Sequence, residues 1–418
     1  MKYIADLHIH SPYSRATSKK SDLNGLFAWA GVKGIQVVGT GDFTHPAWFA
    51  ELRENLEEAE PGFFKLKDES VPTVLPETTP QTSSIRFVLT AEISCIYKKN
   101  GKTRKIHTIL LVPDFEAAKA INSKLSTIGN IESDGRPILG LDVRNLLEIL
   151  LENSENGFMV PAHIWTPWFS LFGSKSGFDT IDECFEDLSS HIFALETGLS
   201  SDPEMIRTIS SLDRFTLVSN SDCHSPSKLG REANLFETGF DFFSMKQALQ
   251  EPSKGGFKGT IEFYPEEGKY HQNGHRKCGV CLTPEETIRY RGICPICKKP
   301  LTIGVMHRIS ELADRKHPVY PKEQERFISL IPLVEILSEI LRVGAGSKKV
   351  LKEYSKLINQ FGSEFDILMD APVDMISQLH STTLAEGINR LRNRNVIRKP
   401  GFDGEYGIIR LFKPGELE

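Results

Sequence analysis

The sequence predicts an α/β fold followed by two smaller units, and three observations lead to this prediction. Short apolar runs alternate with amphipathic helical segments over the first 250 or so residues. Histidines and carboxylates recur where those runs end. Four cysteines then lie close together, before a final stretch with mostly helical periodicity. We therefore expect an α/β domain at 1–250, a linker with a cysteine-ligated unit at 251–304, and a helical domain at 305–418.

The bulk composition is that of a soluble multidomain protein. The chain has 418 residues, too many for one ordinary core, with 39% hydrophobic and 25% charged residues. The formal net charge of -5 does not indicate a polyanionic partner, so any nucleic-acid surface must be local. No apolar run is long enough to span a membrane, the start lacks a secretory signal, and the cysteine pattern indicates a reducing compartment. We expect a cytoplasmic protein.

Strand and helix candidates alternate through the first domain, which predicts parallel strands with crossover helices. The strand candidates are 35–39, 86–90, 106–112, 158–161, 192–195 and 215–219. The helix candidates are 22–31, 46–60, 114–126, 141–153, 202–211 and 241–249. Residues 61–84 and 165–182 are expected to be loops, and 251–268 a linker. Beyond the cysteines, helices are expected at 307–316, 322–343, 347–360 and 373–394, with a hairpin near Asp403.

The polar residues at the strand ends have the chemistry of a metal site. His8 and His10 alternate on one face of the first strand, and Asp222 and His224 repeat that spacing. The other candidates at strand ends are Asp42, His45, Glu92, His107 and His163. Imidazole and carboxylate groups are ligands of Zn²⁺, Mn²⁺ and Fe²⁺. Each alone has a structural explanation, such as a helix cap, but their recurrence predicts one shared site for two or three ions.

The clustered cysteines predict a second, structural metal site. Cys278 and Cys281 form one Cys-x-x-Cys pair, and Cys294 and Cys297 form another. Two such pairs complete a closed tetrahedral site, which predicts a zinc ribbon, with an iron site as the alternative. Basic residues flank the cysteines, among them Arg276 and Lys277. They form either a solvated face or a surface that contacts phosphates.

The order of these motifs resembles the PHP (polymerase and histidinol phosphatase) superfamily over about residues 1–250. The pieces that match are Asp-Leu-His-Ile-His from Asp6, Gly-Thr-Gly-Asp to Asp42, Thr-Ala-Glu-Ile around Glu92, Pro-Ala-His to His163, and Ser-Asn-Ser-Asp-Cys-His to His224. The resemblance implies a (β/α)7 barrel, a trinuclear and usually zinc centre, and phosphoesterase activity. The usual motif histidine is replaced by Phe43.

The same resemblance implies how the ligands are shared among three ions. One ion is implied to be held by His8, His10, Glu92 and Asp222, and a second by Glu92, His107 and His163. A third is implied to be held by Asp42 or His45 together with His224.

The whole chain is similar to a family of lesion-specific DNA endonucleases, through the barrel motifs, the four cysteines and the segment 304–315. The similarity implies that metal-activated water hydrolyses the phosphodiester bond 5′ to a deaminated base (uracil, hypoxanthine or xanthine) or an abasic site. Damaged DNA is then the partner. The alternatives are a small-molecule phosphoesterase of the histidinol-phosphatase type and a DNA-binding scaffold without activity.

This interpretation gives further residues candidate roles. Lys228 or Arg231 would hold a phosphate, unless they form salt bridges at a helix start. The aromatic loop with Trp165 and Trp168 would contact a base taken out of the stack, unless it packs as a hydrophobic lid. The segment 408–412 loosely resembles a clamp-binding peptide, so a sliding clamp is a further candidate partner.

Overall fold

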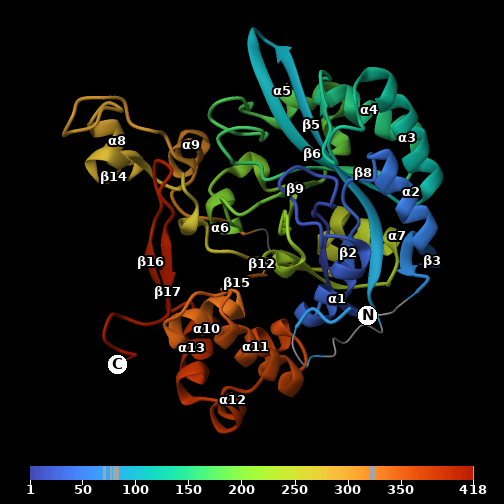
Figure 1. Cartoon of the computed structure of the whole chain (residues 1–418). Coiled ribbons are helices and arrows are strands. Elements are labelled where there is room, and N and C mark those ends of the chain that lie inside the picture. The colour runs from blue at the N-terminus through green and yellow to red at the C-terminus, as the bar shows by residue number, and fades with distance from the viewer. Residues whose placement is uncertain (69–71, 76–77, 79–83, 321–325, 418) are drawn as a thin grey trace.

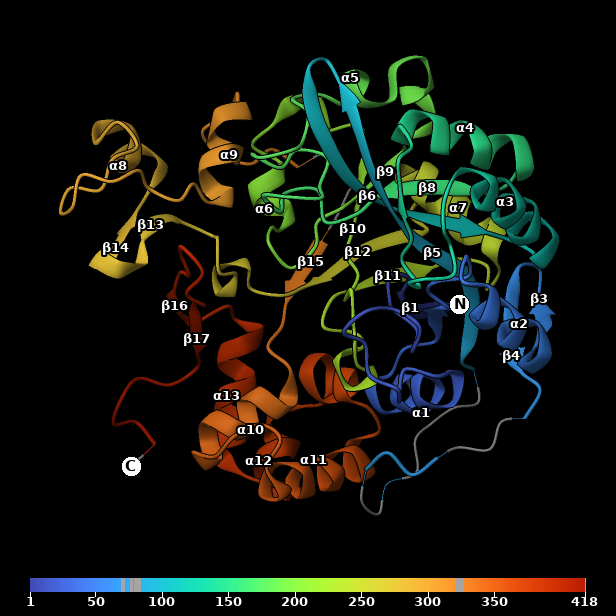
Figure 2. The same ribbon diagram turned by 45° about the horizontal axis from the view of Figure 1, so that its top comes forward.

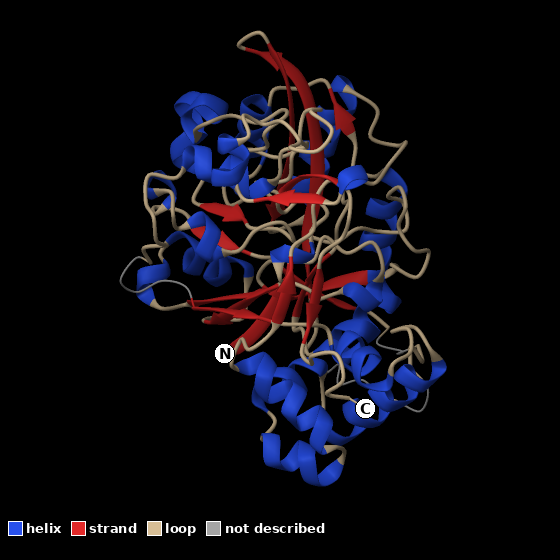
Figure 3. Ribbon diagram, turned by 90° about the vertical axis from the view of Figure 1, so that its left-hand side faces the viewer, coloured by secondary structure: helices blue, strands red, loops and turns tan. Residues whose placement is uncertain are grey.

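The computed structural model describes every residue except 69–71, 76–77, 79–83, 321–325 and 418. The described chain has a mixed α/β body, a small unit to one side of it, and a helical unit beneath (Figure 1). In the body the strands lie centrally and helices cover them from outside (Figure 3). None of the helices that the structure describes combines the length and apolarity needed to cross a membrane.

An 11-stranded sheet forms the centre of the body. Its strands are β1 (Lys2–Asp6), β2 (Val37–Gly39), β3 (Leu56–Glu60), β4 (Phe63–Leu66), β5 (Arg86–Lys99), β6 (Lys102–Val112), β7 (Ile138–Leu139), β8 (Phe158–Pro161), β11 (Ala233–Glu237), β12 (Phe257–Glu262) and β15 (Arg326–Ser329). Two further strands, β9 (Ala194–Glu196) and β10 (Thr216–Val218), pair in parallel with each other.

Helices follow most strands of the body, and more helices build the other two units. Those of the body are α1 (Leu23–Lys33), α2 (Pro46–Asn55), α3 (Phe115–Ile128), α4 (Val143–Asn153), α5 (Ile181–Phe185), α6 (Pro203–Ile206) and α7 (Phe242–Gln250). The small unit contains β13 (Asn273–His275), β14 (Val280–Leu282) and α8 (Pro284–Arg289), followed by α9 (Val305–Leu312). The helical unit contains α10 (Leu333–Leu341), α11 (Lys348–Phe361), α12 (Val373–Leu379) and α13 (Thr382–Arg392), then a hairpin of β16 (Ile397–Lys399) and β17 (Ile408–Arg410).

The sheet is mixed, which corrects the expectation of parallel strands throughout. β2 pairs in parallel with both β1 and β5, whereas β6 runs antiparallel to both β5 and β8. The cause is a tight turn at Asn100 and Gly101, which have φ angles of 53° and 73°. An Asn-Gly pair with positive φ at both residues is typical of a two-residue hairpin, and this hairpin reverses the chain.

One buried cluster joins most strands of the body. It collects side chains from β1, β2, β5, β6, β8, β9, β10 and β11, among them Ala5, Val37, Val88, Ile109 and Val218. Burial on this shared interior holds the strand ends in fixed positions relative to one another. The residues that follow these strands are therefore brought to one region.

Several predicted element boundaries are wrong. The helix expected at 46–60 ends at Asn55, and β3 follows because it pairs with β4 at the sheet edge. The linker expected at 251–268 contains β12. The helix expected at 322–343 begins in residues outside the described part of the chain, and its described part holds β15, which pairs with β12, before α10 starts at Leu333. Pairing and burial override local helix propensity at these places. The chain between 373 and 394 forms two helices instead of one.

Candidate metal centre

Four predicted ligands meet within the body and can hold one ion. His8, His10, Glu92 and Asp222 each offer an atom within 4.8 Å of the others. His10 Nε2 lies 3.0 Å from Asp222 Oδ1 and 3.2 Å from Glu92 Oε2, and His8 Nε2 lies 3.5 Å from the same Glu92 oxygen. Two imidazoles and two carboxylates are a suitable donor set for Zn²⁺, Mn²⁺ or Fe²⁺.

A second group shares Glu92 with the first. His107 Nδ1 lies 2.6 Å and His163 Nε2 3.2 Å from Glu92 Oε1. Glu92 therefore turns one oxygen toward each group, as a bridging carboxylate does between two neighbouring ions. The carboxylate is fully buried in β5, where its charge needs a cationic partner.

The buried Glu196 orients one ligand of each group, although the sequence did not single it out. Both Glu196 oxygens lie 3.1 Å from His8 Nδ1, which directs Nε2 of that ring toward Glu92. Its Oε2 also accepts from the backbone N–H of His163 at 2.8 Å. Carboxylates behind metal-bound histidines fix the ring and raise its basicity. The available signal was an acid directly after a predicted strand.

The other ligand histidines are held in the same manner. Asp42 Oδ1 lies 3.1 Å from His10 Nδ1, and Ser94 Oγ lies 3.1 Å from His107 Nε2. Thr166 Oγ1 lies 3.3 Å from His163 Nδ1. In each ring the second nitrogen remains directed at the carboxylates of the cluster.

The ligand group expected for a third ion is not assembled among the described residues. Asp42 lies behind His10 and accepts hydrogen bonds from Ser11, whose N–H lies 2.7 Å from Oδ2. His45 faces the other way, with Nε2 3.0 Å from the backbone oxygen of Glu132. His224 does lie at the cluster, its ring 4.4 Å from that of His10. Asp42 and His45 both contact the site from behind in this structure, and their assignment as ligands stays a prediction.

The backbone at three of these residues adopts left-handed conformations. Asp42, His163 and Asp222 have φ angles of 49°, 29° and 47°, which are uncommon for residues with a side chain. Such strain persists only where surrounding contacts impose it, and it is concentrated at functional sites. Two of the contacts come from the buried Asp6, which accepts from the N–H groups of Ser221 and Gly230.

The electrostatics of the cluster fit a bound cation. Burial alone would raise the pKa of Glu92, but His107 and Arg136 hold it well below its usual value. Burial lowers the pKa of His107 to about 4, so this imidazole is neutral at pH 7 and free to donate its lone pair. The Nε2 atom of His8 is buried and has no hydrogen-bond partner. Since an unsatisfied buried polar atom is costly, a metal ion is the partner that this atom fits.

A different donor set from the predicted one meets in the small unit. The group consists of His275, Cys278, Cys294 and Cys297, while Cys281 is exposed and outside it. Side chains alternate along β14, where Val280 is buried opposite His275, so Cys281 points to the other face. The structure thus brings His275 to the other three cysteines, and the assignment of Cys281 as a ligand stays a prediction. Three thiolates and one imidazole are also a suitable donor set for a closed tetrahedral metal site.

The residues predicted to contact substrate differ in burial and in their partners. Trp165 is buried and stacks on Phe172 with ring centroids 5.0 Å apart, so it belongs to the core. Trp168 is 44% exposed. Lys228 Nζ lies 3.4 Å from Glu335 Oε1 of α10, which is the salt-bridge alternative. Arg231 stacks over a ring instead, and Arg276 and Lys277 are exposed at the small unit.

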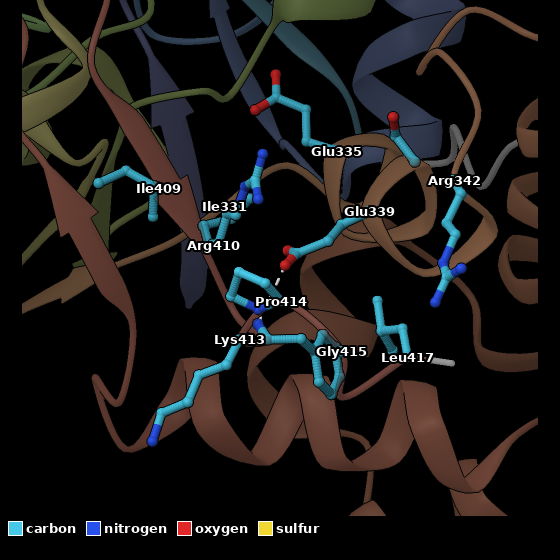
Figure 4. Close-up of a pocket in the computed structure, with 12 residues that line it drawn as sticks. Ile331, Glu335, Glu339, Arg342, Ile409, Arg410, Lys413, Pro414, Gly415 and Leu417 are labelled. Carbon is cyan, nitrogen blue, oxygen red and sulfur yellow. Dashed lines mark hydrogen bonds between the residues drawn. The ribbon is translucent and has the colours of Figure 1, made fainter.

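The C-terminal segment compared with a clamp-binding peptide is packed within the chain. Leu411 and Phe412 are buried, and their N–H groups each donate to Glu339 at 3.0 Å. Glu339 points toward this segment, beside Lys413 and Pro414, at the edge of a cavity of about 430 Å³ (Figure 4). A clamp could take up this segment only after displacing it from α10.

Together the mixed α/β fold and the two ligand groups around Glu92 define a metal-dependent nuclease. The endonuclease Q of Pyrococcus furiosus, a novel lesion-specific endonuclease, superposes with a TM-score of 0.85 and 32% identity, over 100% of this chain and 96% of that chain. The chain belongs to the endonuclease Q family. A second endonuclease Q structure, a complex with a 27-mer duplex substrate that has an abasic lesion at the active site, matches with a TM-score of 0.83 and 32% identity, over 100% and 98% of the two chains.

Two further comparisons concern an archaeal relative. The family described as the MJ0043 C-terminal domain matches residues 332–395, which cover α10 to α13. The uncharacterized protein MJ0043 of Methanocaldococcus jannaschii is 34% identical over 262 residues, which are 61% of this chain and 32% of that protein. This match therefore spans about a third of the relative's length.

Proposed function

We propose that the protein is a DNA-repair endonuclease that cuts the phosphodiester bond 5′ to a deaminated base or an abasic site. Uracil, hypoxanthine and xanthine are the deaminated bases, and the products carry 3′-hydroxyl and 5′-phosphate ends. The observation that carries the proposal is the pair of ligand groups bridged by Glu92, in a chain aligned along its whole length with endonuclease Q. Such a protein would work in the cytoplasm on chromosomal DNA.

The residues of the two groups would hold the metal ions. His8, His10, Glu92 and Asp222 form one site, and Glu92, His107 and His163 form the other, at the mouth of what we take to be a PHP-type barrel. Zn²⁺ suits these donors best, with Mn²⁺ or Fe²⁺ as alternatives. Ions bound there would lower the pKa of a bound water and place positive charge beside the phosphate.

His224 is the imidazole of the cluster best placed to handle a proton. Its side chain is 33% exposed, next to Asp222 and His10. Burial and then His10 lower its pKa, so the ring is neutral at pH 7 and able to accept a proton. Asp222 Oδ1 lies 3.8 Å from Nδ1 of His224 and would stabilise the imidazolium that forms when His224 accepts a proton.

An aromatic pocket beside the ligands is suited to hold a base taken out of the helix. The pocket has a volume of about 610 Å³ and is lined by Trp168, Tyr270, Tyr406 and Phe263 among others. Thr166 also lines it and contacts the ligand His163, so the pocket opens next to the metal centre. Aromatic faces accept any base by stacking, and removal from the stack is required before a base within a duplex can be read.

Positive charge at the same pocket suits the DNA backbone. The Arg231 guanidinium lies 5.1 Å from the centre of the Phe263 ring, and Lys269 Nζ lies 4.8 Å from that of Tyr406. The exposed Arg276 and Lys277 extend this basic surface onto the small unit. Arg231 remains the better candidate for a phosphate contact, because Lys228 is paired with Glu335.

The test is a panel of end-labelled oligonucleotides, each with one uracil, hypoxanthine, xanthine or abasic site, with and without a chelator. We expect a single cut on the 5′ side of the lesion that needs metal, and Asp222→Ala should bind DNA without cutting. Histidinol phosphate and p-nitrophenyl phosphate serve as parallel substrates. Hydrolysis of these small esters with intact DNA would contradict the proposal, and binding without any cleavage would indicate a scaffold.

A further inference from the structure

A guanidinium group reaches the bridging carboxylate of the metal centre. Nη1 of Arg136 lies 2.9 Å from Glu92 Oε2, and the side chain remains 28% exposed. One donor of the guanidinium is therefore used on Glu92, and the exposed part of the group is open to a ligand at the mouth of the site. Arginine has five N–H donors in a fixed plane, which match the oxygens of a phosphate.

The chain around Arg136 is held rigidly on both sides. Asp134 Oδ1 accepts from the N–H of Arg136 at 3.1 Å and from that of Arg15 at 3.2 Å. On the other side the N–H of Ser94, in β5, donates to Pro137 O at 3.0 Å. A side chain fixed in this way loses little freedom when it binds a ligand.

The two residues expected to hold a third ion instead support this segment. His45 Nε2 contacts the backbone oxygen of Glu132 at 3.0 Å. Asp42 packs so closely under Gly135 that a Cβ at that position would lie 2.3 Å from Asp42 Oδ2. The glycine is required there because the backbone approaches the carboxylate directly. Both acid and imidazole thus position the loop that carries Arg136.

The charge of Arg136 acts on the same part of the cluster as the expected third ion. Its field contributes to lowering the pKa of His224, and Asp222 is among the charges that raise the pKa of Arg136. The guanidinium therefore lies within electrostatic range of both residues. A fixed cation at this place has a ready use when the substrate is an anion.

We propose that Arg136 takes the place of the third metal ion and binds a non-bridging oxygen of the phosphate to be cleaved. The inference rests on the proposed function, because it assumes a phosphodiester in this site. Arg136 then has two tasks: it neutralises buried Glu92, and it stabilises negative charge on the phosphate as the attack proceeds. A purely structural role would include only the first task.

The test compares Arg136→Ala and Arg136→Lys with Arg144→Ala as a matched control. Arg144 is an arginine of α4 paired with Glu148 and Asp187 on the outer surface. Metal content is measured first, and we expect three ions in every variant, two in the metal centre and one in the small unit. On DNA with a lesion, Arg136→Ala should lose roughly a hundredfold in kcat, and Arg136→Lys should lose less. Added guanidinium chloride at millimolar concentration should restore part of the activity of Arg136→Ala.

A binding measurement separates the phosphate contact from a structural role. In an Asp222→Ala background, which is expected not to cut, fluorescence anisotropy compares duplexes with a normal phosphate or an uncharged methylphosphonate at the scissile position. The normal phosphate should bind about tenfold tighter when Arg136 is present, and the preference should vanish with Arg136→Ala.

The outcomes distinguish the two proposals. If the wild type cuts lesion-containing DNA and Arg136→Ala cuts it at the same rate, the inference is overturned and the proposed function remains intact. Loss of bound metal in Arg136→Ala, without rescue by guanidinium, also overturns it in favour of a structural role. A wild-type protein that holds both ions of the metal centre but cuts no DNA overturns the proposed function, and the inference with it.

Discussion

At the scale of single residues, the centre depends on atoms behind the ligands. His8 has two ring nitrogens, and only the contact of Nδ1 with Glu196 turns Nε2 toward Glu92. Glu196 is itself fixed by Asn220, whose Nδ2 donates to Oε1 at 2.8 Å. The ring orientation thus follows from a chain of buried hydrogen bonds, because each partner has a single favourable arrangement.

Substitution of Glu196 should therefore weaken metal binding without removing a ligand. We expect Glu196→Gln to lower the affinity of the first site about tenfold to a hundredfold, since an amide holds the His8 ring less firmly and makes it less basic. Isothermal titration of the metal-depleted protein with Zn²⁺ measures the change. Glu152→Gln, at an exposed position of α4, is the control. Equal affinities in the two variants would show that Glu196 does not act on the metal.

The candidate ligand residues could be predicted from the sequence, but the residues that hydrogen-bond to them and orient them could not. His8 and His163 were recognisable because polar residues at the ends of apolar strands gather at one edge of a fold. Glu92 was recognised because the expected strand 86–90 ended just before it, although β5 continues to Lys99. Glu196 also follows an expected strand, but nothing in the sequence shows that it lies behind His8, and Arg136 follows no such pattern. Their roles depend on distances of about 3 Å between segments far apart in the chain, and a sequence pattern does not resolve distances of that size.

At the scale of elements, the candidate metal site of the small unit is built from two similar turns. His275 and Cys278 are separated by two residues, as are Cys294 and Cys297. A left-handed residue follows the second ligand of each pair, namely Gly279 at φ 64° and Lys298 at φ 61°. The equivalence of the turns favours His275-x-x-Cys278 as the partner of the Cys294-x-x-Cys297 pair. The sequence favoured Cys281 because a Cys-x-x-Cys spacing is the more familiar zinc motif.

The two assignments give opposite expectations for two variants. Cys281→Ser should retain the zinc of the small unit and the thermal stability of the wild type, whereas His275→Ala should lose that one equivalent of zinc and unfold the small unit. The reason is that a structural zinc site supplies the folding free energy of a small domain. Metal analysis and thermal unfolding measure both effects. Zinc loss in Cys281→Ser with zinc kept in His275→Ala would restore the four-cysteine assignment.

The loop after His163 divides its aromatic residues between core and pocket. Phe172 is buried against Trp165, while Trp168 is exposed and lies edge-on to Tyr270, with ring centroids 6.1 Å apart. The sequence shows that this loop is aromatic, but it does not show which rings are buried in the core and which face the pocket. Loop residues without periodicity give no indication of which face is buried.

Two substitutions in this loop should therefore behave differently. Trp168→Ala should leave the melting temperature unchanged and weaken binding of lesion-containing DNA by about 1–3 kcal/mol, since one stacking surface is lost. Phe172→Ala should lower the free energy of unfolding by about 3–5 kcal/mol, because it opens a cavity in the core. Calorimetry and fluorescence anisotropy measure the two effects. Unchanged cleavage of uracil and hypoxanthine DNA by Trp168→Ala would remove the pocket from the mechanism.

At the scale of the whole molecule, a buried carboxylate joins the body to the helical unit. Glu364 accepts from Lys33 of α1, from the hydroxyl of Tyr354, and from the N–H of Leu333 at 2.9 Å. Lys33 and Glu364 are 331 positions apart in the sequence, yet both are buried. Their units lie close together in both views (Figure 2). No local pattern in the sequence indicates such a pair.

Removal of this carboxylate should destabilise the junction strongly. Glu364→Ala leaves the Lys33 ammonium buried without a partner, which should cost about 3–5 kcal/mol. The exposed pair of Lys65 and Glu57 provides a control, since Glu57→Ala should cost about 0–1 kcal/mol. Urea unfolding measures both. Similar losses in the two variants would mean that the junction is held by its apolar contacts instead.

All three units approach one another at the aromatic pocket, where charge should respond to pH. Glu267 lines the pocket, and burial followed by the nearby Glu335 raises its pKa to about 7, against the opposing effect of Arg231 and Lys228. Below pH 7 the carboxyl group is mostly neutral and leaves the basic groups free to bind phosphate. Above pH 7 it becomes negative and repels DNA.

DNA affinity should therefore fall as pH rises from about 6 to 8, and Glu267→Gln should bind equally well across this range because its side chain does not titrate. Fluorescence anisotropy in the Asp222→Ala background measures binding without cleavage at each pH. Glu285→Gln, in the exposed first turn of α8, controls for a general change in charge. A parallel loss of affinity in the wild type and Glu267→Gln would place the titrating group elsewhere and separate this carboxylate from the DNA path.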